Sequence, residues 1–195
     1  MPNSFVALDV ETANSDQASI CQIGAVTFEG GEIVGSWQTL VNPEDHFDGM
    51  NISIHGIDQS AVREAPTFPE LASDLGKLLN GRIVASHMPF DRVAMSRVHE
   101  KYELSPLDCT WLDTARVCRR AWAQFSRRGY GLASVASWAG IDFRHHDAEE
   151  DARAAGLILL KAVADTGLTV REWVSRSQQS ISCRSESVPG SIDDV

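Results

Sequence analysis

The chain has 195 residues, 43% of them hydrophobic, and a formal net charge of −10 at neutral pH. That length suits one domain with a sizeable core. A protein that grips duplex DNA over a wide surface is normally basic, so the acidic balance limits any nucleic-acid contact to a local region, such as a strand end.

The sequence also indicates the compartment. Its four cysteines form no Cys-x-x-Cys pair, a pattern that predicts reduced thiols in a cytoplasmic protein rather than disulfides or a zinc knuckle. They are Cys21, Cys109, Cys118 and Cys183. The first apolar run stops at Asp9, which predicts no secretory signal, and no apolar run is long enough to span a membrane.

The first predicted element is a strand over residues 5–12, an apolar, β-prone run that ends in two acids. Side chains alternate along a strand, so Asp9 and Glu11 share one face. Because neighbouring carboxylates repel each other, such a pair indicates a divalent cation between them. A strand that frays into solvent would also leave two acids here, so both interpretations stand at this point.

Residues 20–28 and 33–41 read as two further strands, and Gly30 and Gly31 between them predict a hairpin. The first three strands thus predict an antiparallel meander. Residues 42–65 are expected to be irregular. They contain His55 beside Gly56, and this histidine could contact a ligand or simply cap a turn.

The rest of the chain alternates strands with helices. The expected helices cover residues 67–79, 90–102, 113–122, 132–139, 147–165 and 170–174, and the expected strands cover 82–86 and 109–112. This order predicts an α/β domain over residues 1–175, with a mixed five-stranded sheet flanked by helices. Residues 176–195 are rich in Ser and poor in large apolar groups, which is typical of a disordered polar tail.

Two later sites place acids at helix starts. Asp91 falls in the first turn of the helix at 90–102, where capping alone would explain it. Asp147 is the expected N-cap of the helix at 147–165, and Asp151 follows just over one turn later beside small Ala residues that allow close packing on a sheet. His146 stands just ahead of this helix. A loop histidine and a solvated acid are the alternatives for His146 and Asp151.

These sites together resemble the DEDD exonuclease superfamily in its His subtype, DEDDh. The motifs are Asp9-x-Glu11-Thr12, His87-x-x-Phe90-Asp91 and His146-x-Ala148-x-x-Asp151. The resemblance spans roughly residues 4–170 and extends to exonuclease domains similar to the proofreading epsilon subunit of bacterial DNA polymerase III. The family often carries Asn where Met88 stands, so the resemblance does not extend to a polar contact near the substrate at this position, whereas the metal site is unaffected.

The resemblance implies a ribonuclease H-like fold and two divalent ions, Mg²⁺ or Mn²⁺. The implied metal ligands are Asp9, Glu11, Asp91 and Asp151, with His146 as general base. His146 is preferred over His145 because it lies five residues before Asp151. The implied contacts to the terminal nucleotide are Val10, Thr12, His55 and Phe90.

The implied activity is a 3′-to-5′ exonuclease that releases nucleoside monophosphates from single-stranded 3′ ends, with DNA favoured over RNA and a DNA polymerase as a potential partner in proofreading or repair. The alternatives are an exoribonuclease resembling oligoribonuclease or ribonuclease T, and a non-catalytic polymerase-associated binding module. One basic cluster interrupts the acidic chain and could contact phosphates or form a solvated helix face. Its members are Arg116, Arg119, Arg120, Arg127 and Arg128.

Overall fold

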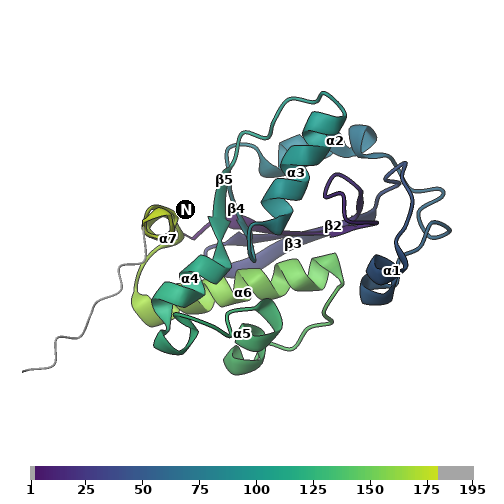
Figure 1. Cartoon of the computed structure of the whole chain (residues 1–195). Coiled ribbons are helices and arrows are strands. Elements are labelled where there is room, and N and C mark those ends of the chain that lie inside the picture. Colours follow the sequence, from purple (N-terminus) through teal and green to yellow (C-terminus); the bar gives the residue numbers. More distant parts are fainter. Residues whose placement is uncertain (1–2, 180–195) are drawn as a thin grey trace, which may run out of the picture.

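A five-stranded mixed sheet forms the centre of the protein (Figure 1). The computed structural model describes residues 3–179. The strands are β1 (Phe5–Thr12), β2 (Ile20–Glu29), β3 (Glu32–Leu40), β4 (Ile83–Ser86) and β5 (Thr110–Asp113), in the order β3-β2-β1-β4-β5. The first three strands are antiparallel, whereas β4 pairs in parallel with both β1 and β5. The α/β fold class predicted from the sequence is confirmed.

Helices cover both faces of the sheet. They are α1 (Gly49–His55), α2 (Phe68–Leu79), α3 (Phe90–Lys101), α4 (Thr114–Ala121), α5 (Leu132–Ala139), α6 (Ala148–Thr166) and α7 (Val170–Gln178), with a 3₁₀ turn at Ala123–Phe125. The long helix α6 runs along one face, with α4 and α5 beside it, and α2 and α3 lie on the opposite side (Figure 1).

The alternation of side chains along β1 decides which face carries the acids. Phe5 and Ala7 belong to the core that includes α4, α5 and α6. The alternate residues of β1 point to the other face. Val6, Leu8 and Val10 belong to the core that includes α2 and α3. Asp9 and Glu11 continue the row of Phe5 and Ala7, because side chains two apart share a face. Both acids therefore lie on the α6 side of the sheet.

Two glycines allow α6 to lie close against the sheet. A Cβ atom on Gly24 of β2 would stand 2.2 Å from the backbone carbon of Ala148 at the start of α6. A Cβ atom on Gly156 would stand 2.2 Å from the ring of Phe28, which stacks on Phe5 with ring centroids 4.6 Å apart. The backbone at the start of α6 cannot move aside as a flexible side chain can. The close approach of α6 to β2 therefore requires glycine at position 24.

We expect Gly24→Ala to lower the free energy of unfolding by about 1–3 kcal/mol, the usual cost of overpacking a core. It should also lower nuclease activity, because it displaces the helix end that carries Asp151. Gly156→Ala should destabilise to a similar degree with a smaller loss of activity, since it acts further along α6. Thermal melts and hydrolysis rates of both variants test this. Gly35→Ala is the matched control, because a Cβ atom there meets nothing within 4 Å.

One helix lies in the stretch that was expected to be irregular. Helix α1 begins after Asp48 and ends at Gly56, whose φ of 76° closes it. None of its residues is buried, so α1 packs no apolar face into the core.

The C-terminal helix runs further than its sequence pattern indicated. Helix α7 continues through Gln178, beyond the boundary placed at residue 175, and Ser177 within it is buried. Residues 180–195, which include Cys183 and most of the predicted tail, lie outside the described residues.

The cysteines that can be placed are free thiols, at Cys21, Cys109 and Cys118. Burial raises the pKa of Cys21 and of Cys118 to about 12, so both stay protonated at neutral pH. Among the helices within residues 3–179, none combines the length and apolar character that crossing a membrane requires.

Candidate active site

Three carboxyl groups from two elements meet where β1 ends. Asp9 and Glu11 come from β1, and Asp151 comes from the first turn of α6. One oxygen atom of each lies within 4.8 Å of the corresponding oxygen atoms of the other two. They line a cavity of about 290 Å³, and Asp151 is only 3% exposed. The carboxyl ends of parallel strands are the usual location of sites in α/β folds.

Asp91 joins this cavity from α3 and also holds β1 in place. Strand β4 pairs with β1 only at Val6 and Ala7, so the backbone N–H of Val10 has no partner on that edge. The Asp91 carboxylate supplies it, because Oδ1 accepts a hydrogen bond from Val10 N at 3.1 Å. Asp91 is buried and lines the same cavity as the three other acids.

Burial and mutual repulsion make these groups weak acids. The pKa of Asp9 lies well above its ordinary value, because of burial first and then the charges of Asp91, Asp151 and Glu11. Burial, together with the charge of Asp151, raises the pKa of Glu11 to about 7. Burial raises the pKa of Asp91 to about 8 although backbone N–H groups oppose it. The cluster therefore resists carrying its full negative charge without a compensating cation.

The donor set fits a hard divalent cation. Carboxylate oxygens are the ligands that Mg²⁺ and Mn²⁺ prefer, and a cation among them would remove the repulsion that raises their pKa values. Asp9, Glu11 and Asp151 are close enough to one another to share an ion. The number and identity of the ions stay a prediction.

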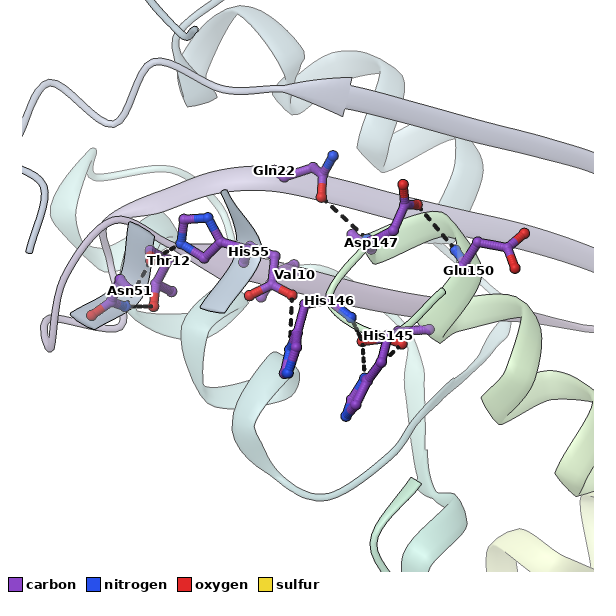
Figure 2. A network of polar contacts seen from close by, with 12 residues as sticks. Val10, Thr12, Gln22, Asn51, His55, His145, His146, Asp147 and Glu150 are labelled. Atoms are coloured by element: carbon purple, nitrogen blue, oxygen red, sulfur yellow. Dashed lines mark hydrogen bonds and ion pairs between the residues drawn. The ribbon is translucent and has the colours of Figure 1, made fainter. Parts of the chain in front are cut away.

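Two stacked histidines face the carboxylates from the loop before α6. The rings of His145 and His146 are 3.9 Å apart and nearly parallel. His145 Nδ1 lies 3.0 Å from both oxygens of Asp151, so this nitrogen donates to the carboxylate. His146 Nδ1 lies 3.9 Å from Glu11 Oε1, and the backbone N–H of His146 donates to Asp151 Oδ2 at 3.1 Å. Figure 2 shows the two rings side by side ahead of α6.

The protonation of His146 suits a base. Burial first, and then the neighbouring His145, lowers the pKa of His146, against a smaller opposing effect of Asp151. The ring is therefore neutral near pH 7 and can accept a proton. The backbone of His146 has a φ of 66°, in the left-handed region that Asn and Gly adopt more easily than most residues.

Helix α1 is tied to the end of β1 by two side chains (Figure 2). Asn51 Nδ2 donates to the carbonyl oxygen of Thr12 at 2.8 Å. His55 Nδ1 accepts from the backbone N–H of Ile57 at 3.0 Å, so Nε2 carries the proton and donates to the same carbonyl at 3.2 Å. Both ring nitrogens of His55 are thus engaged within the protein.

Side chains from the sheet fix the start of α6. Gln22 Oε1 accepts from the backbone N–H of Ala148 at 3.2 Å, and Gln38 Nε2 donates to Asp147 Oδ1 at 2.9 Å. Asp147 caps the helix, as the sequence predicted, by accepting from Glu150 N at 3.3 Å (Figure 2). These bonds position the loop that carries both histidines.

The structure brings most of the predicted site residues to one cavity and leaves two outside it. The lining includes Asp9, Val10, Glu11, Phe90, Asp91, His146 and Asp151. Thr12 and His55 are not part of this lining and hold α1 instead. Their role as contacts to the terminal nucleotide stays a prediction, as do the catalytic roles of the others.

Sequence reasoning missed the support that His87 gives to the opposite wall. His87 Nε2 donates to the carbonyl oxygen of Tyr130 at 2.8 Å, and Nδ1 accepts from the Thr114 hydroxyl at 2.8 Å. Tyr130 and Leu132 line the cavity from this segment. Nothing in the local sequence pattern linked this segment to His87.

Met88 adopts a strained backbone conformation beside the site. Its φ is 80°, and its N–H donates to Asp113 Oδ1 at 3.1 Å. The left-handed region is costly for a side chain such as that of Met and is tolerated by Asn, the residue that the resemblance led us to expect here. Met88 also lines the cavity, with 40% of its surface exposed.

Comparison with known proteins identifies the family. The sequence model of RNase_T, described as Exonuclease, matches residues 6–159. The chain belongs to the exonuclease family. The resemblance to an exonuclease family, which its motifs predicted, is confirmed.

Two curated relatives of this exonuclease domain are much longer proteins. The DNA polymerase III PolC-type of Thermotoga maritima is 31% identical over 164 residues, which cover 82% of this chain and 12% of the polymerase. The 3′-5′ exonuclease DinG of Bacillus subtilis is 30% identical over 164 residues, which cover 80% of this chain and 17% of that protein. The chain thus spans less than a fifth of the length of either relative.

Solved structures share the fold of this exonuclease domain. Exonuclease X, in complex with 5′ overhanging duplex DNA, has a TM-score of 0.72 at 19% identity, covering 89% of this chain and 99% of that one. The nuclease domain of 3′hExo, a DEDDh family member bound to rAMP, has a TM-score of 0.69 at 19% identity, covering 85% and 94%. At these identities the likeness shows a common ribonuclease H-like fold.

Proposed function

We propose that this exonuclease domain degrades nucleic acid from single-stranded 3′ ends in the 3′-to-5′ direction, releases nucleoside monophosphates and prefers DNA to RNA. The observation that carries the proposal is the convergence of Asp9, Glu11 and Asp151 at the end of β1, with His146 beside them. The relative named as the 3′-5′ exonuclease DinG supports the direction of cleavage.

The chemistry follows from the residues in the cavity. Divalent ions held by Asp9, Glu11, Asp91 and Asp151, two Mg²⁺ or Mn²⁺, would supply positive charge to the phosphodiester and to the attacking water. His146 accepts a proton from that water, whose oxygen forms a new bond to phosphorus. The bond from phosphorus to the 3′ oxygen of the preceding nucleotide breaks, and that oxygen takes up a proton and leaves with the strand.

The walls of the cavity suit a terminal nucleotide. Phe90 is 40% exposed and offers an aromatic face on which a base can stack. Val10 lines the floor next to the acids. We propose that both contact the terminal nucleotide directly, and that Thr12 and His55 contact it as well as holding α1.

The preference for DNA rests on the named ligands and functions of the similar proteins. Exonuclease X is described in complex with DNA, and the PolC-type relatives are DNA polymerases. A specific observation supports an exoribonuclease as the second candidate, since the 3′hExo nuclease domain is bound to rAMP. A non-catalytic binding module would have no need for an assembled set of acids, so we rank it last.

A DNA polymerase is the proposed protein partner. The match to a 164-residue segment of PolC-type polymerases indicates that domains of this kind work beside a polymerase. Proofreading or repair would follow from such an association.

A degradation assay with 3′-labelled and 5′-labelled strands of DNA and RNA tests the proposed activity. We expect a 3′ label to appear at once as mononucleotide and a 5′ label to remain on a ladder of shortening strands, with DNA degraded faster than RNA. Hydrolysis should stop in EDTA and return with Mg²⁺ or Mn²⁺. Full activity after thorough chelation would contradict the metal-dependent mechanism, and faster release from RNA would favour the second candidate.

A further inference from the structure

A second, larger cavity lies next to the active-site cavity. Its volume is about 810 Å³, and residues of β5, α3, α4 and α7 form its walls. Met88 and Tyr130 line both cavities, so the two cavities adjoin at these residues. A strand that extends from the active site past Met88 can therefore reach the larger cavity.

Three arginines line this second cavity, namely Arg92, Arg116 and Arg119. Within residues 3–179, no ion pair engages any of the three. The acid in the wall, Asp113, directs Oδ1 to the backbone N–H groups of Met88 and Ala115 instead. The cavity therefore presents positive charge on an otherwise acidic protein.

One of the arginines is held in place by neutral groups. Arg119 Nε donates to the carbonyl oxygen of Ser126 at 3.3 Å, and its guanidinium lies 4.8 Å from the centre of the Tyr130 ring. Stacking on an aromatic ring positions a guanidinium without neutralising it. Burial first, and then the charges of Arg116 and Arg119, lowers the pKa of the neighbouring Arg120, so these cations lie close enough to act on one another.

We propose that this arginine-lined cavity binds backbone phosphates of the nucleic acid whose 3′ end occupies the active site. The inference rests on the proposed function and adds a phosphate subsite to it. Guanidinium groups match phosphate geometry, and three unpaired ones in a cavity of this size suit a polyanion that continues beyond the site. The phosphates belong either to the cleaved strand or to the complementary strand of a duplex end, and the two sources can be separated by experiment.

This assignment changes the composition of the basic cluster. Arg92 on α3 joins it, although it is remote in sequence from Arg116 and Arg119 on α4. Arg127 and Arg128 are exposed and do not line the cavity. Arg120 donates to carbonyl oxygens of Arg116 and Gln179.

The test compares two double variants that remove the same charge. The cavity variant, Arg92→Ala with Arg116→Ala, removes two positive charges from the cavity wall. The control variant, Arg63→Ala with Arg97→Ala, removes two exposed positive charges elsewhere. Affinity is measured for a fluorescent thymidine oligonucleotide and for a blunt DNA duplex over a range of salt, in Ca²⁺ to slow hydrolysis. Hydrolysis of the p-nitrophenyl ester of thymidine 5′-monophosphate, which fills the active site alone, is measured in Mn²⁺.

We expect the cavity variant to bind the single strand roughly tenfold more weakly, with a salt slope flatter by about 1.4, since each phosphate contact on a single strand contributes about 0.7. The control pair should bind like wild type, and both variants should hydrolyse the small ester at the wild-type rate. Loss for both nucleic acids assigns the cavity to the cleaved strand, and loss for the duplex alone assigns it to the complementary strand.

Three results would overturn the proposal: wild-type affinity and slope for both nucleic acids, an equal loss in the control pair, or a loss of ester hydrolysis in the cavity variant. Because binding is measured without turnover, the outcome is independent of the cleavage direction and of the DNA preference. A wild-type protein that binds strands through the cavity but hydrolyses none of them would refute the proposed function and leave this inference intact.

Discussion

Asp9→Asn is expected to lower the hydrolysis rate roughly 10³-fold or more, a loss of about 4 kcal/mol in transition-state stabilisation. Asp9 is close enough to the other three acids to feel their charges. Its pKa is raised by burial first and then by the charges of Asp91, Asp151 and Glu11. Removing its charge weakens the hold on cations that the remaining acids share. Single-turnover release of a 3′-labelled nucleotide at saturating Mg²⁺ measures the effect.

The same substitution should stabilise the metal-free protein at alkaline pH. The folded-state pKa values of Glu11 and Asp91 are raised to about 7 and about 8, whereas unfolded carboxyl groups titrate near 4. The folded state therefore binds more protons, and the free energy of unfolding falls as the pH rises from about 4 to about 8. Burial first, and then the charges of Asp91, Asp151 and Glu11, also raises the pKa of Asp9, so Asp9→Asn removes one of the groups whose ionisation causes this fall.

The measurement is the melting temperature of both proteins in EDTA at several pH values. The variant should melt above wild type by a difference that grows between pH 5.5 and pH 8, to on the order of 5 °C. Adding Mg²⁺ at pH 8 should raise the melting temperature of wild type more than that of the variant. Asp74→Asn is the control, since Asp74 is exposed and its one ion pair within residues 3–179 is with Lys77. A variant that melts below wild type at pH 8 would refute the account of repulsion.

The carboxylate site could be predicted from sequence because each acid lies at the end of a regular element. Strand alternation places Asp9 and Glu11 on one face, and an N-cap followed by small residues turns Asp151 toward the sheet. In an α/β fold these ends meet at one edge, so four local patterns were enough to predict a single site. The structure places all four acids in one cavity.

The supporting contacts could not be predicted, because they join residues that no local pattern connects. The need for Gly24 arises only when α6 crosses β2, and the orientation of His55 depends on a hydrogen bond from Ile57. The arginine-lined cavity brings Arg92 of α3 to α4 across the parallel strands β4 and β5. Helix α1 is only seven residues long, and its apolar residues Met50, Ile52 and Ile54 alternate with polar ones, which is not a helical pattern.

The two adjacent histidines give the second large expected effect. If His146 is the general base, His146→Asn should lower the hydrolysis rate roughly 10²- to 10⁴-fold, the usual contribution of a positioned base. Asn is the appropriate replacement because the φ of 66° at this position would strain Ala. His145→Asn should lower the hydrolysis rate far less. His145 Nδ1 already donates to Asp151, so this ring positions the carboxylate and does not accept a proton there.

The pH profile distinguishes a base from a residue that only holds the site together. The wild-type rate should rise with pH until His146 is deprotonated and then level off, and because burial lowers the pKa of His146 this plateau should begin below the ordinary histidine range near 6.5. His146→Asn should lose this ionisation while keeping the rise in melting temperature that Mn²⁺ produces. His145→Asn should keep the ionisation. If His145→Asn instead shows the larger loss of rate and the altered profile, the base is His145, and the five-residue spacing to Asp151 has identified the wrong histidine.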